Sequence, residues 1–417
     1  MGKQKNIPEL RFTEFKGEWE RNKLEDVVKI NQGLQIAISE RFTEKVENSH
    51  FYITNEFLKA NSKKKYFIKN PPKSVLCTKD DILMTRTGNT GMVVTNVEGA
   101  FHNNFFKVAY PDYINKSFLY NFLKLEQTQK QILKLAGTST IPDLNHSDFY
   151  RIQIPFPTLP EQKRIASFFT VLDKKITELK KKKTLLEHYK KGVVQKLFSQ
   201  EMRFKDDNGK EFPKWEKKSL GEVFSFRTTN SYSRDNLNYE SGDVRNIHYG
   251  DIHTKFNSHF DICNEYVPFI NSEIDLKRIS EDNFCIKGDL IFADASEDYS
   301  DVGKCIEIVN LNKEKVLAGL HTILARPYNY RMSVGFAGHL MKSEYVRLQI
   351  KTIAQGSKVL SISSTRLSNI DLNIPSEEEQ IKITNFLSAL DKKIYRAIIQ
   401  IEKTEIWKKG LLQQMFC

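Results

Sequence analysis

An internal repeat constrains the fold of this chain more than any other feature. Residues 161–198 recur as residues 379–416 at a constant offset of 218 without gaps, and 15 of the 38 positions are identical. Shorter matches precede both copies, in the pairs Arg11-Phe12 with Arg203-Phe204, Trp19 with Trp215, and Ile154-Pro155 with Ile374-Pro375. Self-similarity at one fixed offset indicates a duplicated structural unit. The chain is therefore predicted to contain two diverged copies of one variable domain, each followed by a shared helical segment.

The repeated segments are predicted to be long helices that pair with each other. Their apolar residues follow a 4-3 spacing, which is typical of a helix-helix seam. The seam positions are Ile165, Phe169, Leu172, Ile176, Leu179, Leu186, Val193 and Leu197, and then Ile383, Leu387, Leu390, Ile394, Ala397, Ile401, Leu411 and Met415. Polar residues interrupt it at Lys183, Lys190, Thr404 and Lys408. At 1.5 Å per residue each helix would span roughly 57 Å, too long to bury its apolar stripe on one small domain.

These patterns together predict the fold class and the domain limits. The fold class is α+β, with two tandem mixed α/β domains at residues 1–157 and 201–376. Two helical segments, residues 158–200 and 377–417, follow the domains and pair as an antiparallel coiled coil. A pseudo-two-fold axis that relates the two copies would make the helices antiparallel.

Charge and composition narrow the class of protein. The formal net charge is +12, and its excess lies in residues 1–157 (23 basic, 17 acidic) and 158–200 (11 basic, 4 acidic). A basic surface favours nucleic acid as a partner, although many basic faces are only solvated. No apolar run approaches the roughly 18 residues of a membrane span. The five cysteines are scattered without a C-x-x-C pair, which predicts reduced thiols in a cytoplasmic protein and no zinc site built on paired cysteines.

Polar loops at strand ends supply the candidate contacts to DNA. Ser74–Arg86 and Phe284–Ala293 each predict a turn that enters a buried strand, and a short polar loop follows. Arginine can bond guanine, asparagine can bond adenine, and carboxylates can accept from cytosine. The candidates are Thr85, Arg86, Thr87, Asn89, His102, Asn103, Asn104, Thr138, Ser139, Arg245, Asn246, His248, Tyr249, Ser296, Glu297, His321, Thr322 and Lys358. Ordinary solvent loops and structural histidines explain the same residues, and the sequence leaves both interpretations open.

Catalytic motifs are either incomplete or better explained by packing. Residues 70–73 resemble an adenine-methyltransferase motif, but Lys73 replaces the aromatic ring that stacks on a flipped base. A loose nuclease pattern joins Asp143 to Glu161, but the second copy has Ile381 where that pattern needs a lysine. The Glu-Gln pair at both helix starts therefore indicates capping and packing. We predict no catalytic, cofactor-binding or metal-binding residues in this chain.

The order of the segments resembles that of the type I restriction-modification specificity subunits, over essentially the whole chain. The most specific residues are Ile154-Pro155, Leu159 to Ile165, Leu172-Asp173 with Ile176, Ile374-Pro375 and Glu379-Gln380. The second copy departs from the pattern by having Ser376-Glu377-Glu378 where the first has Thr158-Leu159-Pro160. Base contacts cannot be transferred from the resemblance, because the variable domains differ most within such a family.

The resemblance implies a function and a set of partners. Each variable domain would be a target recognition domain that reads one half of a bipartite double-stranded DNA target. The paired helices would hold two methyltransferase subunits, and motor-nuclease subunits would join them. S-adenosylmethionine, ATP and magnesium would be bound by those partners and not by this chain, which would be non-catalytic. Two alternatives remain open: a stand-alone DNA methyltransferase or nuclease, and a structural coiled-coil scaffold for nucleic acid.

Overall fold

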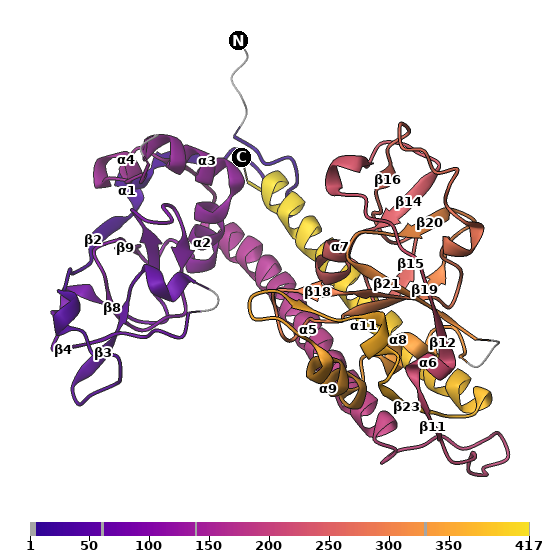
Figure 1. The fold of residues 1–417 in the computed structure, drawn as a ribbon. Helices are drawn as coiled ribbons and strands as arrows, with labels where there is room; N and C mark the ends of the chain where they lie inside the picture. Colours follow the sequence, from indigo (N-terminus) through magenta and orange to yellow (C-terminus); the bar gives the residue numbers. More distant parts are fainter. Residues whose placement is uncertain (1–5, 60–61, 138–139, 329–331, 417) are drawn as a thin grey trace. The chain divides into compact units, whose positions relative to one another are not determined.

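The computed structural model describes residues 6–59, 62–137, 140–328 and 332–416. These residues form two compact units (Figure 1). Unit 1 contains Met1–Lys181 and Ile398–Cys417, and unit 2 contains Lys182–Ala397. Each unit therefore combines one mixed domain with a stretch of each long helix, α5 (Leu159–Phe198) and α11 (Glu377–Gln414). The predicted α+β fold with two long helices is confirmed, whereas the predicted domain limits remain predictions.

Unit 1 contains two four-stranded sheets, with strand orders β2-β9-β6-β7 and β4-β3-β8-β5, and a two-stranded pair β1-β10. All four residues of β6 are buried, because this apolar strand lies inside its sheet. The strands are β1 Glu20–Lys23, β2 Lys29–Gln32, β3 Ser49–Ile53, β4 Phe67–Lys69, β5 Leu76–Cys77, β6 Ile82–Thr85, β7 Val93–Val94, β8 Gly99–Phe101, β9 Phe105–Ala109 and β10 Gln153–Phe156. The helices are α1 Leu24–Val27, α2 Lys116–Lys124, α3 Glu126–Leu135 and α4 His146–Tyr150, with 3-10 turns η1 Ile38–Glu40, η2 Asn55–Leu58 and η3 Lys73–Val75.

Unit 2 has a five-stranded sheet, β12-β21-β17-β19-β15, a four-stranded sheet, β13-β16-β14-β20, and the pairs β11-β23 and β18-β22. The strands are β11 Glu216–Ser219, β12 Phe224–Arg227, β13 Leu237–Asn238, β14 Val244–Ile247, β15 His259–Asp261, β16 Phe269–Ile270, β17 Leu290–Ala293, β18 Ala295–Ser296, β19 Cys305–Asn310, β20 Lys315–Ala318, β21 Thr322–Pro327, β22 Leu360–Ser361 and β23 Asp371–Ile374. The helices are α6 Leu220–Val223, α7 Tyr249–Thr254, α8 Phe336–Leu340, α9 Glu344–Ile353 and α10 Ser364–Leu367, with turns η4 Arg234–Asn236 and η5 Glu281–Asn283.

The main sheets of the two units share one topology. Strands β12, β21, β17 and β19 follow the same spatial order, and the same order along the chain, as β2, β9, β6 and β7. Unit 2 adds β15 at the edge of this sheet, where it pairs with β19 in parallel. The two domains are therefore diverged copies at the level of the sheet, as the repeat predicts.

The long helices run antiparallel in each unit. In unit 1, Leu172 of α5 and Leu411 of α11 belong to one core cluster. Lys180 forms an ion pair with Glu405 at 2.7 Å, and Asp173, earlier in α5, pairs with Lys408, later in α11.

Unit 2 repeats the pairing of unit 1 with the roles of the two helices exchanged. Leu197 of α5 and Leu387 of α11 share a core cluster, and Lys190 pairs with Asp391. Lys190 and Lys408 interrupt the apolar seam in the sequence because each reaches an aspartate of the other helix.

The Glu-Gln pair at each helix start anchors the domain to its helix. In unit 1 the carboxylate of Glu161 accepts two hydrogen bonds from Arg11, at 2.7 and 2.8 Å. The side-chain oxygen of Gln162 accepts from the backbone N–H of Asn115, just before α2.

Unit 2 has the same two anchors. Glu379 accepts from Arg203, and Gln380 accepts from the N–H of Ser333. The interpretation of this motif as a packing element is confirmed.

Candidate nucleic-acid interface

In unit 1 the loop after β6 lies between two other segments of the chain. The N–H of Arg86 donates to the carbonyl of Asn104 at 2.8 Å, which joins the loop to the turn between β8 and β9. The N–H of Leu144 donates to the carbonyl of Arg86 at 2.9 Å, and the hydroxyl of Thr90 donates to Pro142. The two predicted elements at residues 85–91 and 102–104 therefore form one cluster, which also includes residues 142–144.

Arg86 is held in this cluster by a carboxylate. Its Nε and Nη2 atoms donate to the two oxygens of Asp143, at 2.9 and 2.5 Å. This bidentate hydrogen bonding raises the pKa of Arg86. Because a guanine would need the same fork of donors, a base contact by Arg86 requires that Asp143 be displaced or that the remaining donor be used.

Amide and imidazole groups extend the cluster. Burial lowers the pKa of His102 to about 4, so its ring is neutral at pH 7 and its Nδ1 accepts from the N–H of Asn104 at 3.0 Å. The side chain of Asn103 donates to Gln35 at 2.8 Å. Gln32 donates to the carbonyl of Asn103, and its side-chain oxygen lies 2.6 Å from Nε2 of His146.

Unit 2 builds an equivalent cluster after β17. The N–H of Asp294 donates to the carbonyl of His321 at 3.1 Å, and the N–H of Ile362 donates to the carbonyl of Asp294 at 2.8 Å. Nδ1 of His321 lies 3.2 Å from the carboxylate of Asp294. The N–H of Tyr249, at the start of α7, donates to Leu320 at 3.3 Å.

The two clusters correspond position by position at their backbone contacts. Arg86 directly follows β6, and Asp294 directly follows β17. Arg86 bonds to the turn that precedes β9, and Asp294 bonds to the turn that precedes β21. Each also accepts a bond from the segment ahead of the long helix, through Leu144 or Ile362, which are one repeat offset of 218 apart. The two copies therefore carry different side chains on the same backbone frame.

The predicted contact residues fall into groups of different accessibility. The exposed ones are Asn89, Glu297, His321 and Lys358. The partly exposed ones are Arg86, Thr87, His102, Asn103, Asn104, Arg245 and Tyr249. The buried ones are Thr85, Asn246, His248, Ser296 and Thr322. Thr138 and Ser139 lie outside the described residues.

The five buried side chains shape the cluster in this conformation. The hydroxyl of Thr85 donates to the carbonyl of Asn89, and that of Thr322 donates to Gly319. Ser296, the last residue of β18, donates to the carbonyl of Asp298. Side chains with less than a tenth of their surface exposed have little area to offer a ligand unless the loop rearranges, so direct base contacts are better placed on the exposed groups.

The sequence predicts a polar loop around Arg245 and Tyr249, but residues 245–252 are instead a strand followed by a helix. Val244–Ile247 forms β14, and His248 caps α7 by accepting from the N–H of Gly250 at 3.2 Å. Arg245 pairs with Glu314 and stacks over the Phe269 ring at 4.0 Å. The prediction of a loop was wrong because the polar residues of this segment bond within the fold: Arg245 contacts groups beside the neighbouring strands, and His248 caps a helix.

Sequence reasoning missed four residues that complete the clusters. They are Gln32, Gln35 and His146 in unit 1 and His253 in unit 2, whose Nε2 lies 2.9 Å from the carbonyl of Ala295. Gln32, Gln35 and His253 lie more than 40 positions from the loops that they meet, and His146 lies 114 positions from its partner Gln32. No local pattern marks such residues, and only the folded sheet brings them to the loops.

The groups of the possible nuclease pattern have other partners. Asp143 binds Arg86, and Glu161 is buried against Arg11. Two carboxylates neutralised by separate arginines are not arranged as a shared metal site, and the one group of metal-ligand type found within the described part of the chain lies elsewhere, in unit 2.

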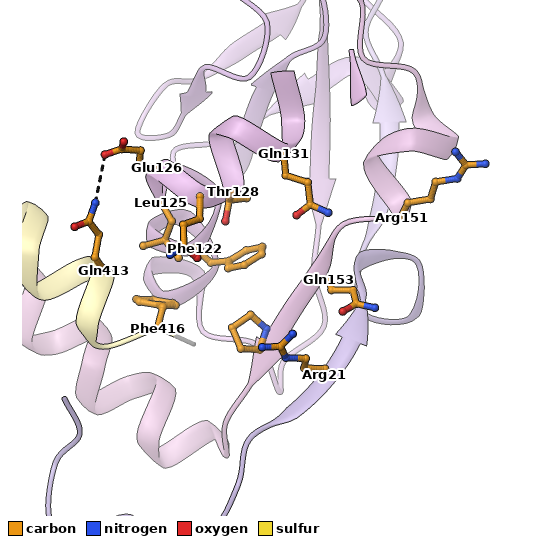
Figure 2. Close-up of a pocket in the computed structure, with 12 residues that line it drawn as sticks. Arg21, Phe122, Leu125, Glu126, Thr128, Gln131, Arg151, Gln153, Gln413 and Phe416 are labelled. Carbon is orange, nitrogen blue, oxygen red and sulfur yellow. Dashed lines mark hydrogen bonds between the residues drawn. The ribbon is translucent and has the colours of Figure 1, made fainter. Parts of the chain in front are cut away.

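A cavity of about 450 Å³ in unit 1 also lacks a catalytic arrangement (Figure 2). Glutamines and two arginines, Arg21 and Arg151, line much of it. Its carboxylate, Glu126, bonds to Lys409 and Lys130, and these bonds lower its pKa to about 2. A carboxylate stabilised as an anion in this way is a poor general acid or base at neutral pH.

Within the described residues, no helix is both long and apolar enough to cross a membrane. The described cysteines, Cys77, Cys263, Cys285 and Cys305, are free thiols.

Comparison with known proteins gives one consistent family. The family model described as "Type I restriction modification DNA specificity domain" matches residues 16–188 and 213–403. The MjaVIII specificity subunit of a type I restriction enzyme from Methanocaldococcus jannaschii is 25% identical over 98% of this chain and 95% of that protein. The MjaIX specificity subunit from the same organism is 26% identical over 40% of each chain.

Solved structures agree on the fold. The type I restriction-modification S subunit from M. genitalium matches with a TM-score of 0.57 at 17% identity, over 99% of both chains. A chain from a structure of type I restriction-modification complex assembly and conformational transition has the same TM-score at 14% identity, over 95% of this chain and 97% of that one. The family model covers most of this sequence in two matches, one for each copy of the repeat. The chain therefore belongs to the family of type I restriction-modification specificity subunits.

Proposed function

We propose that this specificity subunit binds a bipartite double-stranded DNA target, and that the loop cluster of each unit reads one half. The observation that carries the proposal is the duplicated cluster: one backbone frame, built twice, presents Arg86 and Asn89 in unit 1 and Glu297 and His321 in unit 2. Guanidinium, amide and carboxylate groups can discriminate base edges, and imidazole nitrogens can donate or accept a hydrogen bond. Because the two sets differ, the two half-sites should differ in sequence.

We further propose that the long helices hold two methyltransferase subunits, one for each copy of the repeat. Tyr189 of α5 and Trp407 of α11 are one repeat offset of 218 apart, and each is 54% exposed. Large exposed aromatic rings are favoured anchors of protein interfaces. Equivalent anchors on both copies support two equivalent partners, which motor-nuclease subunits would then join.

In this proposal the chain itself is not an enzyme. S-adenosylmethionine would be bound by the methyltransferase subunits, and ATP and magnesium by the motor-nuclease subunits. Two observations support this division. The side chains of the candidate clusters are hydrogen-bond donors and acceptors of the kind that bind base edges. The carboxylates considered for catalysis are paired with arginines or lysines.

The proposed function is tested by reconstitution. The purified chain should bind duplex DNA but transfer no methyl group, and methylation at one bipartite sequence should begin when the methyltransferase subunit is added. Tritium transfer from S-adenosylmethionine measures the activity, and methylome sequencing identifies the target. Methylation by the chain alone, lost on mutation of this chain, would refute the non-catalytic role.

The Arg86→Ala variant should loosen sequence choice in one half-site only. A bidentate contact to a base contributes roughly 1–3 kcal/mol of discrimination, whereas a phosphate contact weakens binding to all sequences and lowers its salt dependence. Binding of a library of half-site variants at several salt concentrations distinguishes the two roles.

Arg86→Lys is the matched control for charge, because lysine keeps the cation but loses the two-pronged donor geometry. It should lose discrimination while retaining the salt dependence of binding. If Arg86→Ala weakens binding equally at every sequence and Arg86→Lys restores it, the residue contacts the backbone instead.

A further inference from the structure

Two histidines and an aspartate meet where the domain of unit 2 packs against α11. They are His259 of β15, His339 of α8 and Asp391 of α11. One ligand atom from each residue lies within 4.8 Å of the other two. The imidazole rings of His259 and His339 have their centroids 4.1 Å apart.

A backbone hydrogen bond orients the imidazole of His259 for ligand binding. Nε2 of His259 lies 2.8 Å from the carbonyl of Gly335. A carbonyl only accepts, so Nε2 carries the proton and Nδ1 keeps its lone pair. Backbone carbonyls of this kind are typical outer-shell partners of metal-bound histidines.

His339 supplies a second, independent observation. Its side chain is 1% exposed, and its Nε2 atom is buried with no hydrogen-bond partner among the described residues. Buried polar atoms in folded proteins nearly always have a partner, and each exception needs an explanation. A bound cation would supply the missing partner.

The local backbone holds His339 in place. The buried carboxylate of Glu307 accepts from the N–H groups of Gly335 and Gly338, which fixes the start of α8. A side chain at Gly338 would lie 3.1 Å from both Glu307 and His259, so the close approach of this helix to β15 favours glycine. His259 is opposite Glu307 in the β15–β19 pairing. Glu307 therefore helps to fix the positions of both imidazoles, through its bonds to the start of α8 and through the pairing of β15 with β19.

The third member of the group is a carboxylate that already has a partner. Asp391 is partly exposed and forms an ion pair with Lys190 of α5. It also lines a cavity of about 520 Å³ together with His339. Three carboxylates and three lysines line this cavity, so its wall has no formal net charge: Glu187, Glu344 and Asp391, and Lys190, Lys191 and Lys342.

We infer that His259, His339 and Asp391 form a site for a divalent transition-metal ion of the Zn²⁺ type. Two imidazoles and a carboxylate are a common donor set for such ions, and water from the cavity would complete the coordination. The metal would replace the ammonium of Lys190 at Asp391. It would then link three elements of unit 2 that are far apart in the sequence, β15, α8 and α11.

Unit 1 contains a natural control for this site. Asp173 is one repeat offset before Asp391 and pairs with Lys408, the repeat equivalent of Lys190. Asn121 occupies the position that corresponds to His339, and the main sheet of unit 1 has no strand equivalent to β15 within its described residues. Unit 1 therefore keeps the ion pair without the histidines.

The experiment is a Zn²⁺ titration of the full chain after dialysis against a chelator, followed by calorimetry, with Co²⁺ absorption to report the ligand set. The wild-type chain should bind one ion tightly. Asp391→Asn should weaken binding by at least the roughly 10- to 100-fold that loss of an outer-shell partner causes, and Asp173→Asn should leave it unchanged. Lys190→Met should tighten binding, because it removes the competing ammonium, whereas Lys408→Met should not.

The substitutions of Asp391 and Lys190 should leave the fold intact, because neither side chain is part of the apolar core. A change in metal binding by these variants therefore does not reflect unfolding. The inference is overturned if the wild-type chain binds no ion, or if Asp391→Asn and Asp173→Asn weaken binding equally. Retention of the tight site in a His259→Ala/His339→Ala variant whose circular dichroism matches that of the wild type would also overturn it.

Discussion

Exchanging residues 205–370 for the matching segment of a related specificity subunit should rewrite one half of the methylated sequence and leave the other half unchanged. The expected change is complete for that half-site, because the whole loop cluster of unit 2 lies inside the exchanged segment. The anchors at Arg203 and Glu379 lie outside it and would still attach the new domain to α11. Methylome sequencing of cells that carry the assembled complex measures the outcome.

The spacing between the half-sites should respond to the helices instead. One added heptad lengthens a helix by about 10.5 Å, which corresponds to roughly three base pairs at 3.4 Å each. Insertions between Lys181 and Lys182 and between Ala397 and Ile398 fall at the boundaries of the two units, so they leave the contacts within each unit intact.

Both helices must be extended in register, since lengthening one alone would misalign the seam. The single insertions are therefore the controls, and they should abolish assembly. A domain exchange that alters both half-sites, or matched insertions that leave the spacing unchanged, would contradict the model of two readers held apart by a helical spacer.

The repeat predicted the fold well because many of the repeated residues pack the two helices against each other. Periodic apolar residues such as Leu172 and Leu390 are buried in the helix seam. The lysines that break this periodicity could not be interpreted from the sequence, since nothing local shows that Lys190 would meet an aspartate 201 positions away. Composition and spacing predict an apolar stripe, but they do not predict which polar residue crosses it.

The candidate site was predicted less completely, for a physical reason. The loop after a buried strand is recognisable from Asp81-Ile82-Leu83, and its place at the strand end is confirmed. Which side chains point outward depends on the hydrogen bonds that each loop makes with distant segments. Asn89 is exposed with a positive φ of 72°, whereas Thr85, four residues earlier, is buried. Their contacts to DNA remain predictions.

The largest effect on stability is expected from the anchor of unit 2. Glu379 has no exposed side-chain surface, and its carboxylate accepts from Nε and Nη2 of Arg203, at 3.1 and 2.6 Å, and from the indole N–H of Trp215, at 2.9 Å. Arg203→Ala leaves a buried carboxylate without a cation. Breaking a buried pair in this way costs about 3–5 kcal/mol, a large share of the roughly 5–15 kcal/mol that stabilises a typical protein.

A second substitution tests whether the lost stability comes from the uncompensated charge of Glu379. Arg203→Ala combined with Glu379→Gln removes the uncompensated charge, so the double variant should be more stable than Arg203→Ala alone. Arg164→Ala is the control for an exposed pair, because Arg164 and Glu14 are both about half exposed and such pairs contribute about 0–1 kcal/mol. Urea unfolding followed by circular dichroism measures all three variants. If Arg203→Ala is no more costly than Arg164→Ala, or if the double variant is the least stable, the buried charge does not govern the attachment of this domain to its helix.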